Sequence, residues 1–191
     1  MNWNKHSDCE GLHAFLGASH YSWLNYTPEQ LRIAYTNIRA KERGTELHQT
    51  AALLIKQHLK LQSTKQTINM YVNDAIAFRM TPEQVLYYSK NAFGTADAIS
   101  FRKEKGNLTL RIHDLKTGKQ IAKFEQLMIY AAFFCLEYRV KPETINIVLR
   151  IYQSCEVREL VCDPTVIQSV MDKVVLSDTI VTKVREEEGE E

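Results

Sequence analysis

The sequence predicts an α/β (α+β) fold in which one central mixed β-sheet is flanked by helices. Three features of the element order support this prediction. Helical segments come first, a run of three β-type segments follows, and a long apolar helix then separates that run from two further strands. A helix of that length between two strands permits a parallel crossover, while the short connections within the three-strand run favour antiparallel pairing.

The chain opens with helices. Thr27-Pro28-Glu29-Gln30 combines an N-cap threonine, a proline at the first helical position and a glutamine three residues after the cap, which predicts a helix that ends near Lys41. Gly44 is expected to break this helix. Thr45 can then cap a second helix over about 46–61.

The strands are indicated by β-branched and aromatic runs between turn residues. Thr81-Pro82-Glu83-Gln84 repeats the helix start signal, but VLYYS follows it and predicts a strand after a short turn. The apolar segment KFEQLMIYAAFFCLEYR, residues 123–139, predicts a helix that Pro142 prevents from continuing. The remaining predicted elements are a helix over about 66–79, strands over about 95–102, 108–115, 145–153 and 157–162, and a last helix from Asp163 or Thr165 to about Val175.

The length favours a single domain. A chain of 191 residues can bury a sizeable core, so we expect one domain over residues 1–183 and a disordered acidic tail over 184–191. No apolar run approaches the roughly 18 residues that a membrane span needs, and the N-terminus lacks the basic-then-apolar order of a signal peptide. We therefore expect a cytoplasmic protein, in the host cytoplasm if a phage encodes it.

Charge and cysteine content are compatible with more than one kind of protein. The formal net charge is +1, and without the five C-terminal glutamates it would be +6, which fits either contact with a polyanion or a soluble protein with an acidic end. The four cysteines, Cys9, Cys135, Cys155 and Cys162, form no CxxC pair and match no compact cluster motif. Buried thiols are therefore favoured over an iron–sulfur cluster.

Two predicted strands that should pack on a core carry acids. Asp97 lies in the first strand of a hairpin and Asp114 at the end of the second. If the two carboxylates converge, they repel each other unless a cation lies between them, and Mg²⁺ suits such a site because it prefers oxygen ligands and keeps waters for a substrate phosphate. Lys116, on the same strand face as Asp114, could orient water or stabilise charge on phosphate oxygens. The alternative is a solvated hairpin with two unconnected surface acids.

Four motifs change the balance between these alternatives. They are Gly44-Thr45-Glu46-Leu47-His48, Gly94-Thr95-Ala96-Asp97, Asp114-Leu115-Lys116-Thr117-Gly118 and Gln126-Leu127-Met128-Ile129-Tyr130. In this order they resemble the motifs of the PD-(D/E)XK nuclease superfamily, and more narrowly the RecB-type nuclease domain and its short, phage-encoded exonuclease-like relatives. LGASHYSWL, residues 16–24, is also similar to the first segment of such phage-type proteins, though less specifically.

The resemblance implies a restriction-endonuclease-like core and a role for each matching residue. The metal ligands it implies are His48, Asp97, Asp114 and the Leu115 carbonyl. The catalytic residues it implies are the lysine Lys116 together with Asp114, Asp97, Gln126 and Tyr130. Gln126 and Tyr130 share a helix face at i and i+4, where they would line the site and position the DNA backbone.

Each assignment has an alternative. His48 shares a partly apolar helix face with Ala52 and Ile55, where a histidine is often only a hydrogen-bonded core residue. Gln126 and Tyr130 could satisfy a buried backbone group or fill the core. Among the nearby acids, Glu83 could join the metal, while two others are expected to be solvated, Glu46 and Glu125.

The function predicted on this basis is a Mg²⁺-dependent DNA nuclease. It would be an exonuclease that hydrolyses phosphodiester bonds in phage-type DNA recombination or processing, with Mn²⁺ able to replace Mg²⁺. Basic side chains could contact phosphates, and the candidates are Arg102, Lys103, Lys119 and Lys123. No iron–sulfur cluster is expected, because the three clustered C-terminal cysteines of cluster-bearing superfamily members are missing.

The predicted partners are DNA and a recombination or single-strand-binding protein, and a homo-oligomer is compatible with the sequence. Two other functions stay open. One is a catalytically inactive nucleic-acid- or partner-binding module with the nuclease fold, which the complete His–Asp–Asp–Lys set disfavours. The other is an unrelated metal-binding protein that acts on a different phosphate ester.

Overall fold

The computed structural model describes residues 5–9, 11–118 and 120–189. The chain groups into two compact units, Met1–Arg43 and Gly44–Glu191, which are described separately. One domain over 1–183 stays a prediction. Lys119, the side chain of Cys9 and the last two residues of the predicted tail lie outside the described residues. In the described part of the chain, no helix combines the length and the apolar character that a membrane crossing requires.

The first unit contains two short 3₁₀ helices, Ser7–Cys9 and Ala18–Asn25, and the first turns of helix α1 (Pro28–Lys56). The predicted helix start is confirmed. The Thr27 N–H donates to Gln30 Oε1 at 2.9 Å, and the Gln30 N–H donates to Thr27 Oγ1 at 3.2 Å. The side chain of each residue therefore accepts a hydrogen bond from the backbone N–H of the other.

Gly44 does not break α1, so the two helices predicted on either side of it are one helix. The physical reason lies in another part of the chain. A Cβ atom at position 44 would lie 2.8 Å from Thr117 Oγ1, so glycine at this point allows a close approach to the segment that follows the third strand.

The second unit is built on a five-stranded mixed sheet, which confirms the predicted fold class. Its strands are β1 (Thr81–Ser89), β2 (Ala92–Glu104), β3 (Asn107–Lys116), β4 (Asn146–Gln153) and β5 (Glu156–Val161), in the order β1-β2-β3-β4-β5. All neighbouring strands are antiparallel except β3 and β4, which are parallel and are joined through a helix as predicted.

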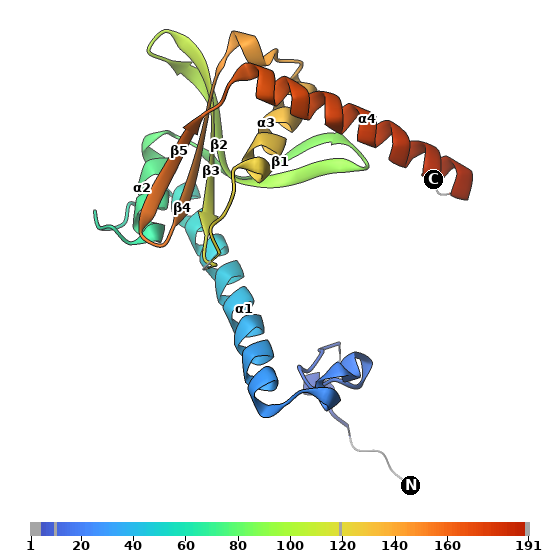
Figure 1. The fold of residues 1–191 in the computed structure, drawn as a ribbon. Coiled ribbons are helices and arrows are strands. Elements are labelled where there is room, and N and C mark those ends of the chain that lie inside the picture. Colours follow the sequence, from blue (N-terminus) through green and yellow to red (C-terminus); the bar gives the residue numbers. More distant parts are fainter. Residues whose placement is uncertain (1–4, 10, 119, 190–191) are drawn as a thin grey trace. The chain divides into compact units, whose positions relative to one another are not determined.

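Helices cover both faces of the sheet (Figure 1). Helices α3 (Glu125–Tyr138) and α4 (Pro164–Glu188) contribute to one apolar cluster with the strands, and the short 3₁₀ turn Pro142–Thr144 contacts α4. Helix α2 (Thr67–Ala77) and the last turns of α1 form a second cluster on the opposite side. The predicted site residues lie on strands between these two clusters and on the helices next to them.

Two element boundaries differ from the prediction. Strand β1 begins at Thr81 rather than after a turn at 81–84, and it can include Pro82 because β1 is an edge strand. Helix α4 continues to Glu188, beyond the predicted end near Val175 and through the first residues of the expected tail, and Gly189 in the left-handed conformation caps it with φ 71°.

Candidate metal centre

Three acids line up across three neighbouring strands. Pro82 pairs with Ala98 and Gln84 pairs with Ala96. Glu83 of β1 therefore lies opposite Asp97 of β2. The β2–β3 register, extended by one residue, sets Asp97 opposite Asp114 of β3. The antiparallel pairing therefore brings together carboxylates that are far apart in the sequence, and His48 approaches this row from α1.

His48, Glu83 and Asp97 form a group that could hold a metal ion. One ligand atom from each lies within 4.8 Å of the other two, and His48 Nδ1 is 3.4 Å from Asp97 Oδ2. Glu83 has a φ of 52°, a left-handed conformation in which a non-glycine residue of a strand is strained. Strain of this kind concentrates at functional sites, because the surrounding structure must hold the residue there.

Asp97 is fixed by the strand next to it. Its Oδ2 accepts a hydrogen bond of 2.9 Å from the Leu115 backbone N–H. Leu115 was predicted to supply its carbonyl to the metal. The structure assigns its N–H to Asp97, while its side chain is fully buried in the apolar cluster formed with α2.

Asp114 and Lys116 belong to a second part of the site, which faces α3. Lys116 Nζ lies 3.0 Å from Asp114 Oδ1 and donates a 2.8 Å hydrogen bond to Gln126 Oε1. Gln126 Nε2 in turn donates to the Tyr130 hydroxyl at 3.1 Å. Four of the five catalytic residues implied by the resemblance, all but Asp97, thus form a continuous chain of contacts from β3 to α3.

Tyr130 is held close to β2 by a glycine. A Cβ atom at position 94 would lie 2.9 Å from Tyr130 Cε1, so only a residue without a side chain lets the ring approach the strand this closely. Gly94 belongs to the same motif as Asp97, and this contact gives the glycine of that motif a physical role.

The electrostatics of the site favour a cation. Burial, and secondarily the charge of Asp97, raises the pKa of Asp114 to about 6, and Lys116 and His48 oppose this rise only in part. Asp114 Oδ2 is buried and has no hydrogen-bond partner among the described residues. The hydrogen bond with Asp97 raises the pKa of His48, against the effect of burial. Burial, and then Asp97, raises the pKa of Glu83.

The residues present fit a divalent cation. Carboxylate oxygens suit a hard ion such as Mg²⁺ or Mn²⁺, and an imidazole adds a ligand that Mn²⁺ readily accepts. A buried carboxylate oxygen without a partner is costly unless something completes its interactions, and within residues 5–9, 11–118 and 120–189 Asp114 Oδ2 is such an oxygen. Asp114 lies outside the group of three within 4.8 Å, so an ion bound by all four residues would draw it closer to Asp97.

A hollow opens beside His48. It has a volume of about 500 Å³ and is lined by Glu83 and by one side of α1, namely Thr45, His48, Gln49, Ala52, Leu53 and Lys56. Part of the site is therefore accessible to a ligand larger than a metal ion.

The other predicted side chains lie away from this centre or are solvated. Arg102 and Lys103 lie five and six residues further along β2, and Arg102 donates to the Arg79 carbonyl. Lys123 is exposed just before α3. The two acids expected to be solvated are indeed exposed, Glu46 and Glu125.

Sequence reasoning gave Glu83 only a minor place and did not name Tyr71. Tyr71 of α2 is 2% exposed, and the charges of Asp97, Glu83 and Asp114 add to burial in raising its pKa. The signal for Glu83 was its position just before the predicted VLYYS strand, but the Thr-Pro-Glu-Gln pattern predicted a turn there. No local pattern singled out Tyr71.

Comparisons with known proteins add little to this geometry. No protein-family model matches the chain, and no curated protein matches it. A solved structure described as the crystal structure of SSO0001 is similar with a TM-score of 0.34 and 13% sequence identity, over 73% of this chain and 69% of that one. A similarity this low supports no conclusion about fold or function.

Proposed function

We propose that this protein is a Mg²⁺-dependent nuclease that hydrolyses phosphodiester bonds in DNA, acting as an exonuclease in phage-type recombination or DNA processing. One observation carries the proposal. An imidazole, a row of carboxylates and a lysine come from four separate elements, α1, β1, β2 and β3, and lie close together in the second unit. The order of the sequence motifs supports the same chemistry.

His48, Glu83, Asp97 and Asp114 would hold the cation. When bound, a divalent cation supplies charge stabilisation to a phosphate and lowers the pKa of water, which is the chemistry that phosphodiester hydrolysis requires. The residues around it orient these ligands. The Leu115 N–H fixes Asp97 through Oδ2, so Asp97 presents its other oxygen in a defined direction.

Lys116 would act on the reacting groups. Its ammonium group is oriented by Asp114 Oδ1 and by Gln126 Oε1, and the third N–H remains to hold a water or a phosphate oxygen. An ammonium group held in advance stabilises charge that grows on phosphate oxygens without reorganising at that moment. Tyr130 keeps the Gln126 amide turned toward Lys116, so it acts as a positioning residue.

The test is degradation of linear double-stranded and single-stranded DNA with and without Mg²⁺. We expect product only with the metal and only with Lys116 present, so Lys116→Ala should abolish it. Lys141→Ala is the matched control, because Lys141 is an exposed lysine just before the Pro142–Thr144 turn, beyond the far end of α3 from Gln126. Its rate should equal that of the wild type.

The inactive-module alternative makes a different prediction. If wild type and Lys116→Ala were equally inactive while both still bound DNA, the nuclease proposal would be wrong and the chain would be a binding module. Cleavage of nucleotides or of another phosphate ester, with DNA left intact, would instead identify a different phosphoesterase.

A further inference from the structure

Helix α4 carries an exposed apolar stripe along its second half. Its first turns pack on the core through Ile167, Met171 and Val174. Beyond them, four apolar side chains are between 43% and 61% exposed: Leu176, Ile180, Val181 and Val184. Water-exposed apolar side chains at helical spacing indicate a surface that packs against something.

The opposite side of this half-helix is fixed by polar contacts with the β1–β2 hairpin. Asp178 Oδ1 accepts hydrogen bonds from Ser89 Oγ at 2.5 Å and from Asn91 Nδ2 at 2.9 Å. Arg185 Nη1 donates to Asn91 Oδ1 at 2.9 Å. These contacts orient the helix but bury little apolar surface, and a helical segment of this length is marginal in water without apolar packing.

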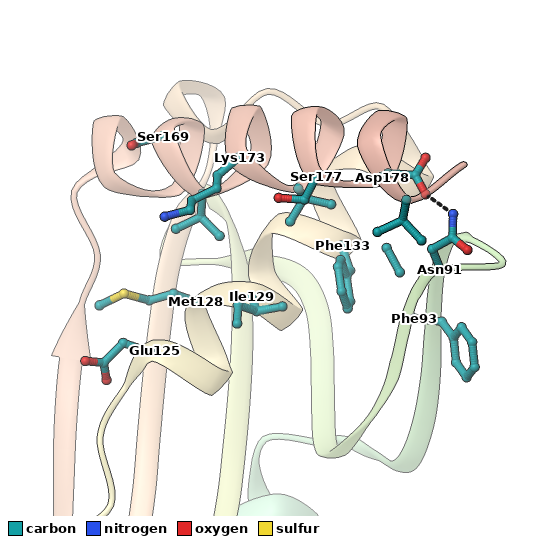
Figure 2. Close-up of a pocket in the computed structure, with 14 residues that line it drawn as sticks. Asn91, Phe93, Glu125, Met128, Ile129, Phe133, Ser169, Lys173, Ser177 and Asp178 are labelled. Atoms are coloured by element: carbon teal, nitrogen blue, oxygen red, sulfur yellow. Dashed lines mark hydrogen bonds between the residues drawn. The ribbon is translucent and has the colours of Figure 1, made fainter. Parts of the chain in front are cut away.

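A groove runs beside the stripe, between α3 and α4 (Figure 2). It has a volume of about 530 Å³, and Lys173 and Ser177 lie on its α4 side. Its apolar lining comes from the hairpin, α3 and α4: Ala92, Phe93, Met128, Ile129, Phe133, Val170, Val174 and Val181. The groove and the stripe are therefore neighbouring parts of one apolar surface.

The sequence of α4 has the spacing of a helix-pairing seam. Lys173, Ser177, Ile180, Val184 and Glu187 follow one another at intervals of four and three residues, the pattern of positions that face a partner helix. Lys173 and Glu187 each lie seven residues from Ile180. An antiparallel copy of the same helix, centred on Ile180, would therefore set Lys173 opposite Glu187 of the second copy, twice. A parallel copy would set like charges against each other.

From this charge pattern we infer that the chain forms a two-fold symmetric dimer, in which α4 packs antiparallel against α4 of a second copy and covers the α3–α4 groove. A two-fold interface uses the same surface on both subunits, and the seam from Lys173 to Glu187 is self-complementary in this sense: Ile180 lies at its centre, and opposite charges lie at its two ends. The inference does not depend on the proposed nuclease activity.

The test measures the dimer dissociation constant of the full chain by sedimentation equilibrium. Ile180→Glu should raise this constant by about 30-fold or more, as for a residue at the centre of an interface. Since Ile180 is 55% exposed, this change should leave the helical circular dichroism signal intact. Wild type that remains monomeric up to its solubility limit, or an Ile180→Glu variant that dimerises as well as wild type, would overturn the inference.

Charge exchange tests the antiparallel register. Lys173→Glu and Glu187→Lys should each weaken the dimer, because each homodimer then holds two like-charge pairs. An equimolar mixture of the two variants should dimerise again, because both pairs in the mixed dimer are complementary. Glu186→Lys is the matched control for Glu187→Lys. It makes the same charge change one residue earlier, at a position that points about 100° away from Glu187 around the helix and so lies off the seam. Failure of the mixture to recover would refute the pairing.

Discussion

Replacing Asp114 with asparagine should stabilise the metal-free protein at alkaline pH. The Asp114 side chain is 3% exposed, and burial raises its pKa from 3.8 to about 6, despite the nearby Lys116 ammonium. A carboxyl whose pKa is higher in the folded state favours folding while it is protonated. That contribution is complete below pH 3.8 and is lost as the pH rises through 6.

The expected magnitude follows from this difference. The pKa rises by about two, and each pKa unit corresponds to about 1.4 kcal/mol, so ionised Asp114 destabilises the fold by about 3 kcal/mol at pH 8. Asparagine keeps the shape and cannot ionise. Asp114→Asn should therefore be about 3 kcal/mol more stable than wild type at pH 8, and the gain should shrink to about 1 kcal/mol near pH 4.5.

Urea unfolding in the presence of a chelator, repeated across this pH range, measures the difference. Asp172→Asn is a suitable control, because Asp172 is exposed on α4 and its replacement should change stability by less than about 0.5 kcal/mol at either pH. If Asp114→Asn were less stable than wild type at pH 8, or if its advantage did not change with pH, the assigned environment of Asp114 would be wrong.

Three further predictions concern other parts of the second unit. His48→Ala should weaken Mn²⁺ binding, measured by calorimetry, by about tenfold or more, since even residues that only support metal ligands have effects of this size. Gly94→Ala should lower the DNA cleavage rate but leave Mn²⁺ affinity near that of wild type, because its Cβ would displace the Tyr130 ring and not a ligand. Tyr152→Phe should cost about 1–3 kcal/mol in urea unfolding, because the Tyr152 hydroxyl donates to Asp74 Oδ2 at 2.7 Å and is almost fully buried.

The element order could be predicted because it depends on local patterns. Apolar periodicity identified α2, α3 and most of the strands, and the helix between β3 and β4 indicated the one parallel pair. The motifs likewise identified residues that lie close together at the site, because each motif lies near the end of a predicted strand or on a predicted helix. These features need no knowledge of what lies elsewhere in the chain.

The parts that could not be predicted depend on contacts across long separations. Gly44 was predicted to break the helix, but it is needed because Thr117, which follows strand β3, approaches the helix too closely for a side chain at position 44. The run of glutamates predicted a disordered tail, but the end of α4 is held by a hydrogen bond from Arg185 to Asn91, which lies 94 residues away. The sequence near the tail does not reveal this contact. The Thr-Pro-Glu-Gln pattern predicted a turn at Glu83, whereas the structure places this residue inside strand β1 in a left-handed conformation with φ 52°. No local pattern predicts such a conformation within a strand.

The cost of ionising Asp114 also gives a reason to expect a cation at this site. If the position only had to pack, an amide or an apolar side chain would serve the fold better than an acid whose Oδ2 finds no hydrogen-bond partner in the described part of the chain. A ligand that binds only the folded state offsets such a cost by about 2.7 kcal/mol at 100 times its dissociation constant and by about 4.1 kcal/mol at 1,000 times. A divalent cation present between these two levels would therefore cancel the roughly 3 kcal/mol that Asp114 costs. The same carboxylate that weakens the empty fold would then be one of the groups that binds the ion.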